Sequence, residues 1–174
     1  MFCDLVGSSA LSEQLDPEDL RRVIRIYQET CGVMIERYSG YVSRYMGDGI
    51  LVFFGYPLAH EDAPVRAVLA GLDIIEEIKN LDLNLNKQSI KLAVRVGIST
   101  GLVVAGDLIG EGSSEEKAVV GETPNIAARL QSLAKPNSIL IHQTTAGLCR
   151  NLIKFKPLGE KLLKGFTTAT HVYK

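Results

Sequence analysis

The sequence predicts an α+β fold in which helices pack on one face of a mixed β-sheet. The order of the expected elements, β-α-β-β-α-β-β-α-β, indicates one layered sheet rather than a helical bundle. With 174 residues, of which 46% are hydrophobic, the chain is long enough to bury one compact core. It carries no internal repeat and no low-complexity stretch, so residues 1–174 are expected to form a single domain.

The N-terminal segment is expected to contain one strand and one long helix. Residues 1–6 have the apolar composition of a buried strand whose start is cut short, which suggests a domain excised from a larger protein. A helix is predicted to begin at Pro17, with Asp16 as its cap, and to run to about Tyr38. Apolar residues recur at helical spacing along it, and Ser39-Gly40 is expected to end it.

The next expected elements are a hairpin and a second helix. Residues 41–46 and 50–54 are short β-type runs around Gly47-Asp-Gly49, and Asp-Gly between apolar runs is a strong hairpin signal. Helical spacing of apolar residues then continues from about residue 61 to residue 80. His60-Glu-Asp62 is expected to cap this helix rather than bind a metal, because consecutive residues diverge at a helix start.

Two β-branched runs follow a polar loop. Residues 81–89 are asparagine-rich and predict that loop. Residues 92–98 and 102–105 are expected to form a second hairpin through Ser99-Thr-Gly101. Residues 106–117 are rich in glycine, serine and glutamate and predict a mobile loop.

The C-terminal third is expected to complete the sheet. Thr123-Pro124 predicts the start of a short helix that runs to about Leu133. A strand at 139–142 and a short helix at 143–149 come next, and residues 154–173 are expected to form a hairpin that turns near Lys164-Gly165.

Composition excludes several classes of partner. The net charge of −1, the pI near 6.3 and the scattered basic residues give no support for nucleic-acid or membrane-surface binding. No apolar run approaches the roughly 18 residues that cross a bilayer, and no signal peptide is visible. Cys3, Cys31 and Cys149 are odd in number and lack metal-ligand spacing, so we expect reduced, packed cysteines and a cytoplasmic location.

Two aspartates are the first candidates for chemistry. Asp4 and Asp48 each stand where a short apolar run breaks into a glycine-containing turn, so both carboxylates can lie at strand ends. Paired carboxylates beside small residues are what hard divalent cations and nucleoside triphosphates require. The small residues Gly7, Ser8 and Ser9 after the first strand leave backbone N–H groups free to face phosphates. The alternative is an ordinary structural turn at each position.

A third segment adds an amide and a guanidinium at helical spacing. Pro124 sets the helix start, and Asn125 and Arg129 are four residues apart, so they lie on one face and can reach the same ligand. The guanidinium can offset charge on phosphoryl oxygens, and the amide can position a ribose. The alternative is a surface arginine beside a capping asparagine.

The three segments, in this order, make the chain resemble the catalytic domain of class III nucleotidyl cyclases over nearly its whole length. The matching stretches are Phe2-Cys-Asp-Leu-Val-Gly-Ser-Ser9, Tyr45-Met-Gly-Asp-Gly-Ile-Leu-Val-Phe-Phe54, Arg95-Val-Gly-Ile-Ser-Thr-Gly101 and Val120-Gly-Glu-Thr-Pro-Asn-Ile-Ala-Ala-Arg-Leu130. The run Ala59-His-Glu-Asp-Ala63 is most similar to the bacterial branch akin to soluble adenylyl cyclases. The resemblance implies a ferredoxin-like mixed or antiparallel sheet with helices packed on it.

The resemblance also implies the chemistry. It implies a homodimer with composite sites, in which Asp4, Asp48 and the Leu5 carbonyl of one subunit hold two Mg²⁺ or Mn²⁺ ions. Asn125 and Arg129 would come from the other subunit, and Lys164 would bind phosphate. The implied reaction converts ATP to 3′,5′-cyclic AMP and pyrophosphate. Gly7, Ser8 and Ser9 match the substrate-binding turn.

The departures from the family pattern fall where the base is recognised. Adenylyl cyclases of this family usually have lysine where Arg44 stands, and aspartate or threonine where Ala118 stands. Arg44 keeps the positive charge, whereas Ala118 cannot bind an exocyclic amine. Arg44 also cannot replace the glutamate of guanylyl cyclases, so ATP is favoured over GTP.

Three alternatives remain beside an adenylyl cyclase. The altered base-recognising pair favours a degenerate nucleotide-binding regulatory module, whereas the intact Asp4, Asp48, Asn125 and Arg129 favour an enzyme. A guanylyl cyclase needs guanine acceptors that the sequence does not offer. A diguanylate cyclase is disfavoured because no Gly-Gly-Asp/Glu-Glu-Phe hairpin is present.

Overall fold

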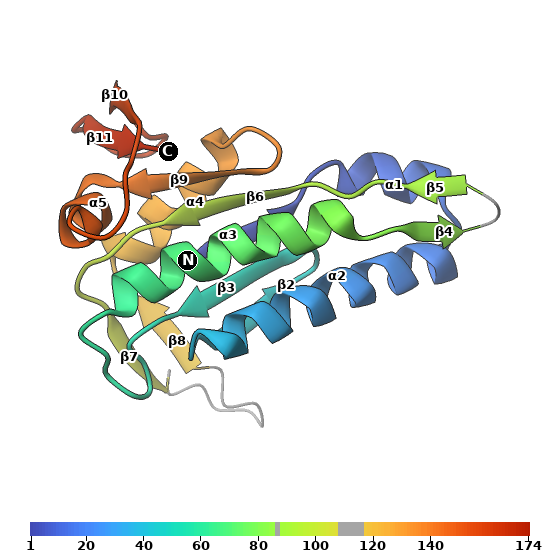
Figure 1. Ribbon diagram of the computed structural model, residues 1–174, viewed down its shortest axis with the longest axis horizontal. Coiled ribbons are helices and arrows are strands. Elements are labelled where there is room, and N and C mark those ends of the chain that lie inside the picture. Colours follow the sequence, from blue (N-terminus) through green and yellow to red (C-terminus); the bar gives the residue numbers. More distant parts are fainter. Residues whose placement is uncertain (86–87, 108–116) are drawn as a thin grey trace.

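A seven-stranded mixed sheet forms the centre of the protein, in the order β10-β11-β9-β6-β1-β3-β2 (Figure 1). The computed structural model describes residues 1–85, 88–107 and 117–174. Strand β6 pairs with β9 in parallel, and the other pairs in this sheet are antiparallel. The strands of this sheet are β1 (Phe2–Leu5), β2 (Tyr41–Met46), β3 (Gly49–Phe53), β6 (Val94–Ile98), β9 (Ser138–His142), β10 (Pro157–Lys161) and β11 (Thr170–Tyr173).

Two small sheets and five described helices complete the fold. Strand β4 (Leu83–Leu85) pairs with β5 (Gln88–Ile90), and β7 (Val104–Asp107) pairs with β8 (Lys117–Val120). The helices are α1 (Ser8–Gln14), α2 (Pro17–Arg37), α3 (Ala63–Asn80), α4 (Glu122–Leu133) and α5 (Gln143–Cys149). None of the helices in the described segments combines the length and the apolar character that crossing a membrane requires.

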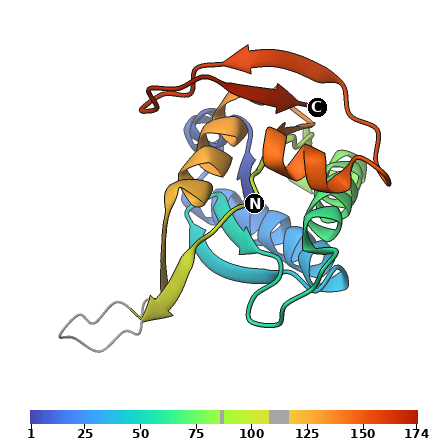
Figure 2. The same ribbon diagram turned by 90° about the vertical axis from the view of Figure 1, so that its left-hand side faces the viewer.

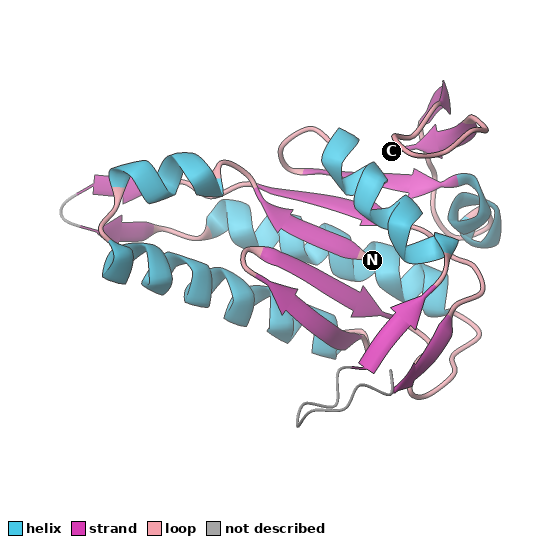
Figure 3. Cartoon of the chain, turned by 180° about the vertical axis from the view of Figure 1, so that it is seen from behind, coloured by secondary structure: helices cyan, strands magenta, loops and turns pink. Residues whose placement is uncertain are grey.

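Helices cover both faces of the central sheet. Side chains alternate between faces along a strand, so neighbours on β6 point in opposite directions. The Val96 side chain approaches Gly71 of α3, whereas the position of a Cβ on Gly97 lies against the backbone of α4. On β9, Ile139 and Ile141 belong to the core on the α3 face, and Leu140 belongs to a separate cluster under α4. Figures 2 and 3 show α4 on the side of the sheet opposite α2 and α3.

The expected α+β class is confirmed, but the expectation of helices on one face is wrong. Helical periodicity predicts that α4 has a buried side, and it does bury Leu130. Periodicity does not say which face of the sheet receives that side, because both faces are apolar at their centre.

Close packing of α4 on β6 depends on Gly97. A Cβ at this position would collide with the carbonyl oxygen of Ala127 and the amide nitrogen of Gln131, both backbone atoms of α4. We therefore expect Gly97→Ala to destabilise the protein by about 3 kcal/mol, since backbone atoms cannot rotate away from the added methyl. Chemical denaturation measures this loss. Gly147→Ala is the matched control, because a Cβ there meets no atom within 4 Å; equal stability of the two variants would contradict the prediction.

Most N-terminal elements agree with the sequence prediction. Helix α2 begins at Pro17, and the Asp16 carboxylate accepts hydrogen bonds from the amides of Glu18 and Asp19. The first hairpin turns at Gly47 and Asp48 as expected. The short helix α1 was not expected as a separate element; it begins after Gly7, whose φ of 74° is left-handed, and no side chain caps it.

Three local predictions are wrong. Residues 92–98 and 102–105 do not form a hairpin, because β6 joins the central sheet whereas β7 pairs with β8. Residues 81–89 include β4 and β5 rather than only a loop. Asp62 does not cap α3, since its carboxylate accepts a hydrogen bond from Arg66 instead.

The remaining predictions agree or lie partly outside the described residues. The proposed loop at 106–117 includes residues 108–116, which lie outside them, while its ends belong to β7 and β8. Helix α5 and the C-terminal hairpin of β10 and β11 are confirmed. All three cysteines are buried and unpaired, as expected.

Candidate active site

The two predicted metal-binding aspartates lie together, one on β1 and the other in the turn between β2 and β3. Cys3 and Leu5 of β1 are buried in the core under α2 and α3, so Asp4 between them points to the α4 face. Asp48 lies in the turn between β2 and β3, and β3 pairs with β1. Asp4 Oδ1 lies 3.8 Å from the position of a Cβ on Gly49, the residue after Asp48, and Asp48 raises the pKa of Asp4, so the two carboxylates are neighbours. The fold therefore joins two residues that are 44 positions apart (48 − 4) in the sequence.

The turn that carries Asp48 is held in place from α2. Gln28 donates a hydrogen bond from Nε2 to the carbonyl oxygen of Gly47, at 2.9 Å. Gly47 has a φ of 64°, which is left-handed and favours glycine. The predicted Gly-Asp-Gly turn is thus a defined conformation with a tether, and both features restrict where the Asp48 carboxylate can lie.

The surroundings of Asp4 disfavour its ionisation when no cation is bound. The pKa of Asp4 is raised from 3.8 to about 6, mainly because the half-buried position disfavours the charged form. The negative charge of Asp48 and a hydrogen bond with it raise this pKa further, while Gln131 and Arg95 lower it. A bound cation would relieve the repulsion between the two carboxylates, so the pair is electrostatically suited to a cation.

Gln131 and Arg95 contact this centre, and neither was predicted as a site residue. Gln131 donates from Nε2 to Oδ2 of Asp4, at 2.9 Å. Arg95 lies directly opposite Asp4 in the β1–β6 register, and its buried Nε has no hydrogen-bond partner among the described residues. The available signal for Arg95 was a charged residue inside the apolar run at 92–98. Gln131 had no such signal, because helical spacing alone does not say what its buried side faces.

The donor atoms fit a hard divalent cation. Asp4 and Asp48 supply carboxylate oxygens, and the predicted third donor, the Leu5 carbonyl, is in the adjacent residue of β1. Mg²⁺ typically binds through one or two carboxylates and fills its remaining positions with water and substrate phosphate. In the described part of the chain, no group of three or more His, Cys, Asp or Glu side chains could hold a metal ion. Two neighbouring carboxylates are suited to a hard cation whose remaining positions are filled by water or phosphate.

The predicted phosphate-binding turn follows Asp4 directly. The left-handed Gly7 ends the segment after β1, and α1 begins at Ser8 and continues through Ser9. This places the first amides of α1 within five residues of Asp4 (9 − 4) along the chain.

Asn125 and Arg129 are not brought to Asp4 of the same chain. Both are exposed on α4, whereas Gln131 on the same helix is buried against Asp4. Residues on a helix advance by about 100° each, so Asn125 and Arg129 are separated from Gln131 by about 120° and 160° around the axis. The prediction that they share a face agrees with their exposure, and that face points away from Asp4.

Lys164 lies beside the C-terminal half of α4. Its neighbour Leu163 is buried in the cluster that contains Leu130 and Ala134, and Lys164 itself is exposed. The fold therefore brings the predicted phosphate-binding lysine to the same helix as Arg129.

The two base-recognising positions are described to different degrees. The hydroxyl of Tyr45 on β2 approaches Gly32 of α2, so the preceding Arg44 points to the opposite face of the sheet, the face of Asp4. Ala118 lies in β8 opposite Gly106, and its side chain is outside the described part.

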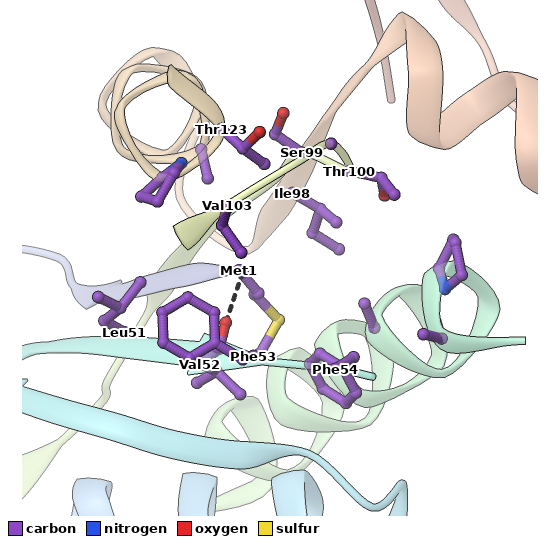
Figure 4. A pocket seen from close by; sticks show the side chains of 16 residues that line it. Met1, Leu51, Val52, Phe53, Phe54, Ile98, Ser99, Thr100, Val103 and Thr123 are labelled. Carbon is purple, nitrogen blue, oxygen red and sulfur yellow. Dashed lines mark hydrogen bonds between the residues drawn. The ribbon is translucent and has the colours of Figure 1, made fainter. Parts of the chain in front are cut away.

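A cavity of about 100 Å³ lies near the N-terminal end of β1, away from this centre (Figure 4). Met1, Phe54, Ile98 and Thr123 are among the residues that line it, and the Met1 amine donates to the carbonyl oxygen of Val52. None of the predicted site residues lines this cavity, so we do not assign it to the site.

Comparison with known proteins gives the class that this fold and centre define. The chain belongs to the family of adenylate and guanylate cyclase catalytic domains, whose model matches residues 1–174. The resemblance found in the sequence motifs is confirmed, and so is the cyclase fold.

Relatives in this family are named for different nucleotides. The chain is 25% identical to adenylate cyclase 1 of Rhizobium meliloti (strain 1021), over 99% of this chain and 26% of that protein. It is 32% identical to the cytidylate cyclase of Escherichia coli, over 82% of this chain and 33% of that protein. The crystal structure of the guanylate cyclase domain of RhGC from Catenaria anguillulae, in complex with GTP, superposes with a TM-score of 0.90 at 26% identity, covering 99% of this chain and 91% of that one. The chain thus spans a third or less of the two curated relatives.

Proposed function

We propose that this chain is the catalytic domain of an adenylyl cyclase, excised from a longer protein, that converts ATP to 3′,5′-cyclic AMP and pyrophosphate. The observation that carries the proposal is that Asp4 of β1 lies close to the turn that carries Asp48, beside Arg95. The kinship with a named adenylate cyclase supports ATP as the substrate. The domain would act in the cytoplasm, where its substrate is abundant.

In this proposal, Asp4, Asp48 and the Leu5 carbonyl hold two Mg²⁺ or Mn²⁺ ions. The ions would lower the pKa of the ribose 3′-hydroxyl and stabilise charge on the phosphates. Arg95 supplies a positive charge on the same face as Asp4, which attracts a phosphate bound beside the carboxylates. The amides after Gly7, at Ser8 and Ser9, can donate to the triphosphate.

The second half of the site is proposed to come from another copy of the chain. Asn125 and Arg129 point away from Asp4 of their own chain, so they serve catalysis only if they face the carboxylates of a partner. There Asn125 would orient the ribose, and Arg129 would stabilise the charge that develops on the α-phosphoryl oxygens. Lys164, next to α4, would enter the same site and bind phosphate.

In this proposal, the donor groups of Arg44 govern which base is recognised. The Arg44 guanidinium can donate two parallel hydrogen bonds, whereas the Watson–Crick edge of adenine presents one acceptor, N1, beside its donating amine. Cytosine presents two adjacent acceptors, O2 and N3, which match a guanidinium fork better. CTP is therefore a second candidate substrate, and the 32% identity to a cytidylate cyclase favours it.

The first test is turnover by the purified dimer with Mn²⁺ and ATP, GTP, CTP or UTP, each supplied separately. The expected product is cyclic AMP, identified by mass. Cyclic CMP alone would move the assignment to CTP. Nucleotide binding without any product at high protein concentration would favour a non-catalytic regulatory module.

The base preference is expected to shift with Arg44 and Ala118. A double change, Arg44→Lys with Ala118→Thr, adds a hydroxyl near the exocyclic amine and returns a single point donor. We expect the kcat/KM for ATP to rise about tenfold relative to that for CTP or GTP, as one hydrogen bond contributes about 1–1.5 kcal/mol. Lys91→Arg, on an exposed residue, serves as the control. An unchanged ratio would show that neither position recognises the base.

A further inference from the structure

Gln131 connects the carboxylate centre to α4 by an oriented hydrogen bond. Its side chain is 7% exposed, and Nε2 donates to Oδ2 of Asp4, at 2.9 Å. A carboxylate only accepts hydrogen bonds, so the amide nitrogen of Gln131, and not its oxygen, faces Asp4. The amide orientation is therefore determined by its surroundings.

The helix that carries Gln131 is packed tightly on the strand next to Asp4. Gly97 of β6 lies against the backbone of Ala127 and Gln131, and β6 pairs with β1 through Arg95 and Asp4. Strands β1 and β6 and helix α4 thus form one close-packed unit. Interiors of this density transmit small shifts rather than absorb them.

The opposite side of this unit bears Asn125 and Arg129. These residues are exposed on α4 and are separated from Gln131 by about 120° and 160° around the helix axis. In a dimer with composite sites, one helix would therefore hold Asp4 of its own chain with one side and serve the partner's site with the other.

We propose that Gln131 is a positioning residue that couples the two active sites of the dimer. By holding Asp4, it sets the metal-binding geometry of one site, and through the same helix it sets where Asn125 and Arg129 lie in the other site. This inference rests on the proposed function, because it requires composite sites. Cation binding at one site then favours the catalytic arrangement at the other.

The effect of Gln131 on metal binding by Asp4 is tested by measuring Mn²⁺ affinity, with no catalytic assay. Gln131→Met keeps an unbranched side chain of similar length but removes the donor. Mn²⁺ titration of the nucleotide-free protein, followed by electron paramagnetic resonance, is expected to show affinity weakened about tenfold to a hundredfold, as is typical when a ligand loses its hydrogen-bonding support. Gln143→Met, at an exposed position on α5, is the matched control. If Gln131→Met is folded by circular dichroism and binds Mn²⁺ with unchanged affinity, Gln131 does not position Asp4. If Gln131→Met fails to fold, Gln131→Leu takes its place in the same titration.

The coupling is tested in a dimer with only one working site. An Arg129→Ala chain paired with an Asp48→Ala chain retains one site, built from the carboxylates of the first chain and the Arg129 of the second. Placing Gln131→Met in the first chain should raise the Mn²⁺ concentration needed for activity. Placing it in the second chain leaves the working carboxylates with their own Gln131, and we expect kcat at saturating Mn²⁺ to fall about threefold to tenfold.

The outcomes separate the coupling from the proposed function. If Gln131→Met in the Asp48→Ala chain leaves kcat the same as the Gln143→Met control does, Gln131 acts only on Asp4 of its own chain. That result would overturn the coupling. If the unmodified mixed dimer has no activity despite proven subunit exchange, the composite site itself fails, and the coupling fails with it. The Mn²⁺ titration still tests the hold on Asp4 in that case.

Discussion

Asp4→Asn is expected to yield a protein that is inactive yet more stable than the wild type at pH 8 without metal. The wild-type fold must hold a half-buried carboxylate next to Asp48, and asparagine removes that charge while keeping an oxygen that can accept from Gln131. Turnover with Mn²⁺ should fall by about 1,000-fold or more, equivalent to about 4 kcal/mol of transition-state stabilisation.

The stability gain follows from the sign of the pKa shift. The folded pKa of Asp4, about 6, is higher than its ordinary value of 3.8, so the fold favours the protonated form. The stabilisation that results is complete below pH 3.8 and is lost as the pH rises to about 6. The full difference corresponds to about 3 kcal/mol, which we reduce to about 1–2 kcal/mol because the group is half exposed.

The measurement is urea denaturation in the presence of a chelator at pH 4.5 and pH 8. We expect the advantage of Asp4→Asn to be largest at pH 8 and to shrink at pH 4.5, where the wild-type carboxyl is mostly protonated. Asp82→Asn, at an exposed position, controls for the loss of one negative charge. A variant that is less stable than wild type at pH 8, or one that keeps Mn²⁺-dependent turnover, would refute the assignment of Asp4.

Two inactive variants, Asp48→Ala and Arg129→Ala, are expected to recover activity when mixed. Each homodimer lacks one half of both composite sites. After random exchange about half of the dimers are mixed, and each mixed dimer has one intact site, so about a quarter of the wild-type activity should return. The cause is geometric: Arg129 points away from the carboxylates of its own chain.

The control for this experiment is a mixture of Asp48→Ala with Asp4→Ala. Both changes affect the same half of the site, so no mixed dimer contains an intact one. Activity is followed as cyclic nucleotide formed after incubation, and subunit exchange is verified by mass spectrometry with one isotope-labelled variant. Equal activity in the two mixtures would show that the sites are not shared between chains.

Local physical chemistry accounts for the features that the sequence predicted well. Asp16 before Pro17 starts α2, and Gly47-Asp-Gly49 makes the turn of the first hairpin, because both depend on contacts within a few residues. The carboxylates, the amide and the guanidinium of the candidate site were found in the same way, since their residue types and spacing are visible in the chain.

Long-range competition accounts for the errors. Residues 102–105 were expected to pair with the strand at 92–98, which precedes them in the chain. They contribute instead to β7, which pairs with β8. A short apolar strand can pair with the edges of several other strands, and its own composition does not select one of them. The same holds for 81–89, where β4 and β5 pair with each other in a small separate sheet.

The sequence by itself determined the family and the α+β class, and it supplied the candidate residues for binding metal and phosphate, because these depend on residue type and order. Only the tertiary structure decided that α4 covers the face opposite α3, that Arg95 and Gln131 adjoin Asp4, and that Arg129 faces away. Asp4 and Gln131 are 127 residues apart in the chain. Their contact arises because α4 packs on the sheet, and no local pattern in the sequence specifies which face of the sheet α4 covers.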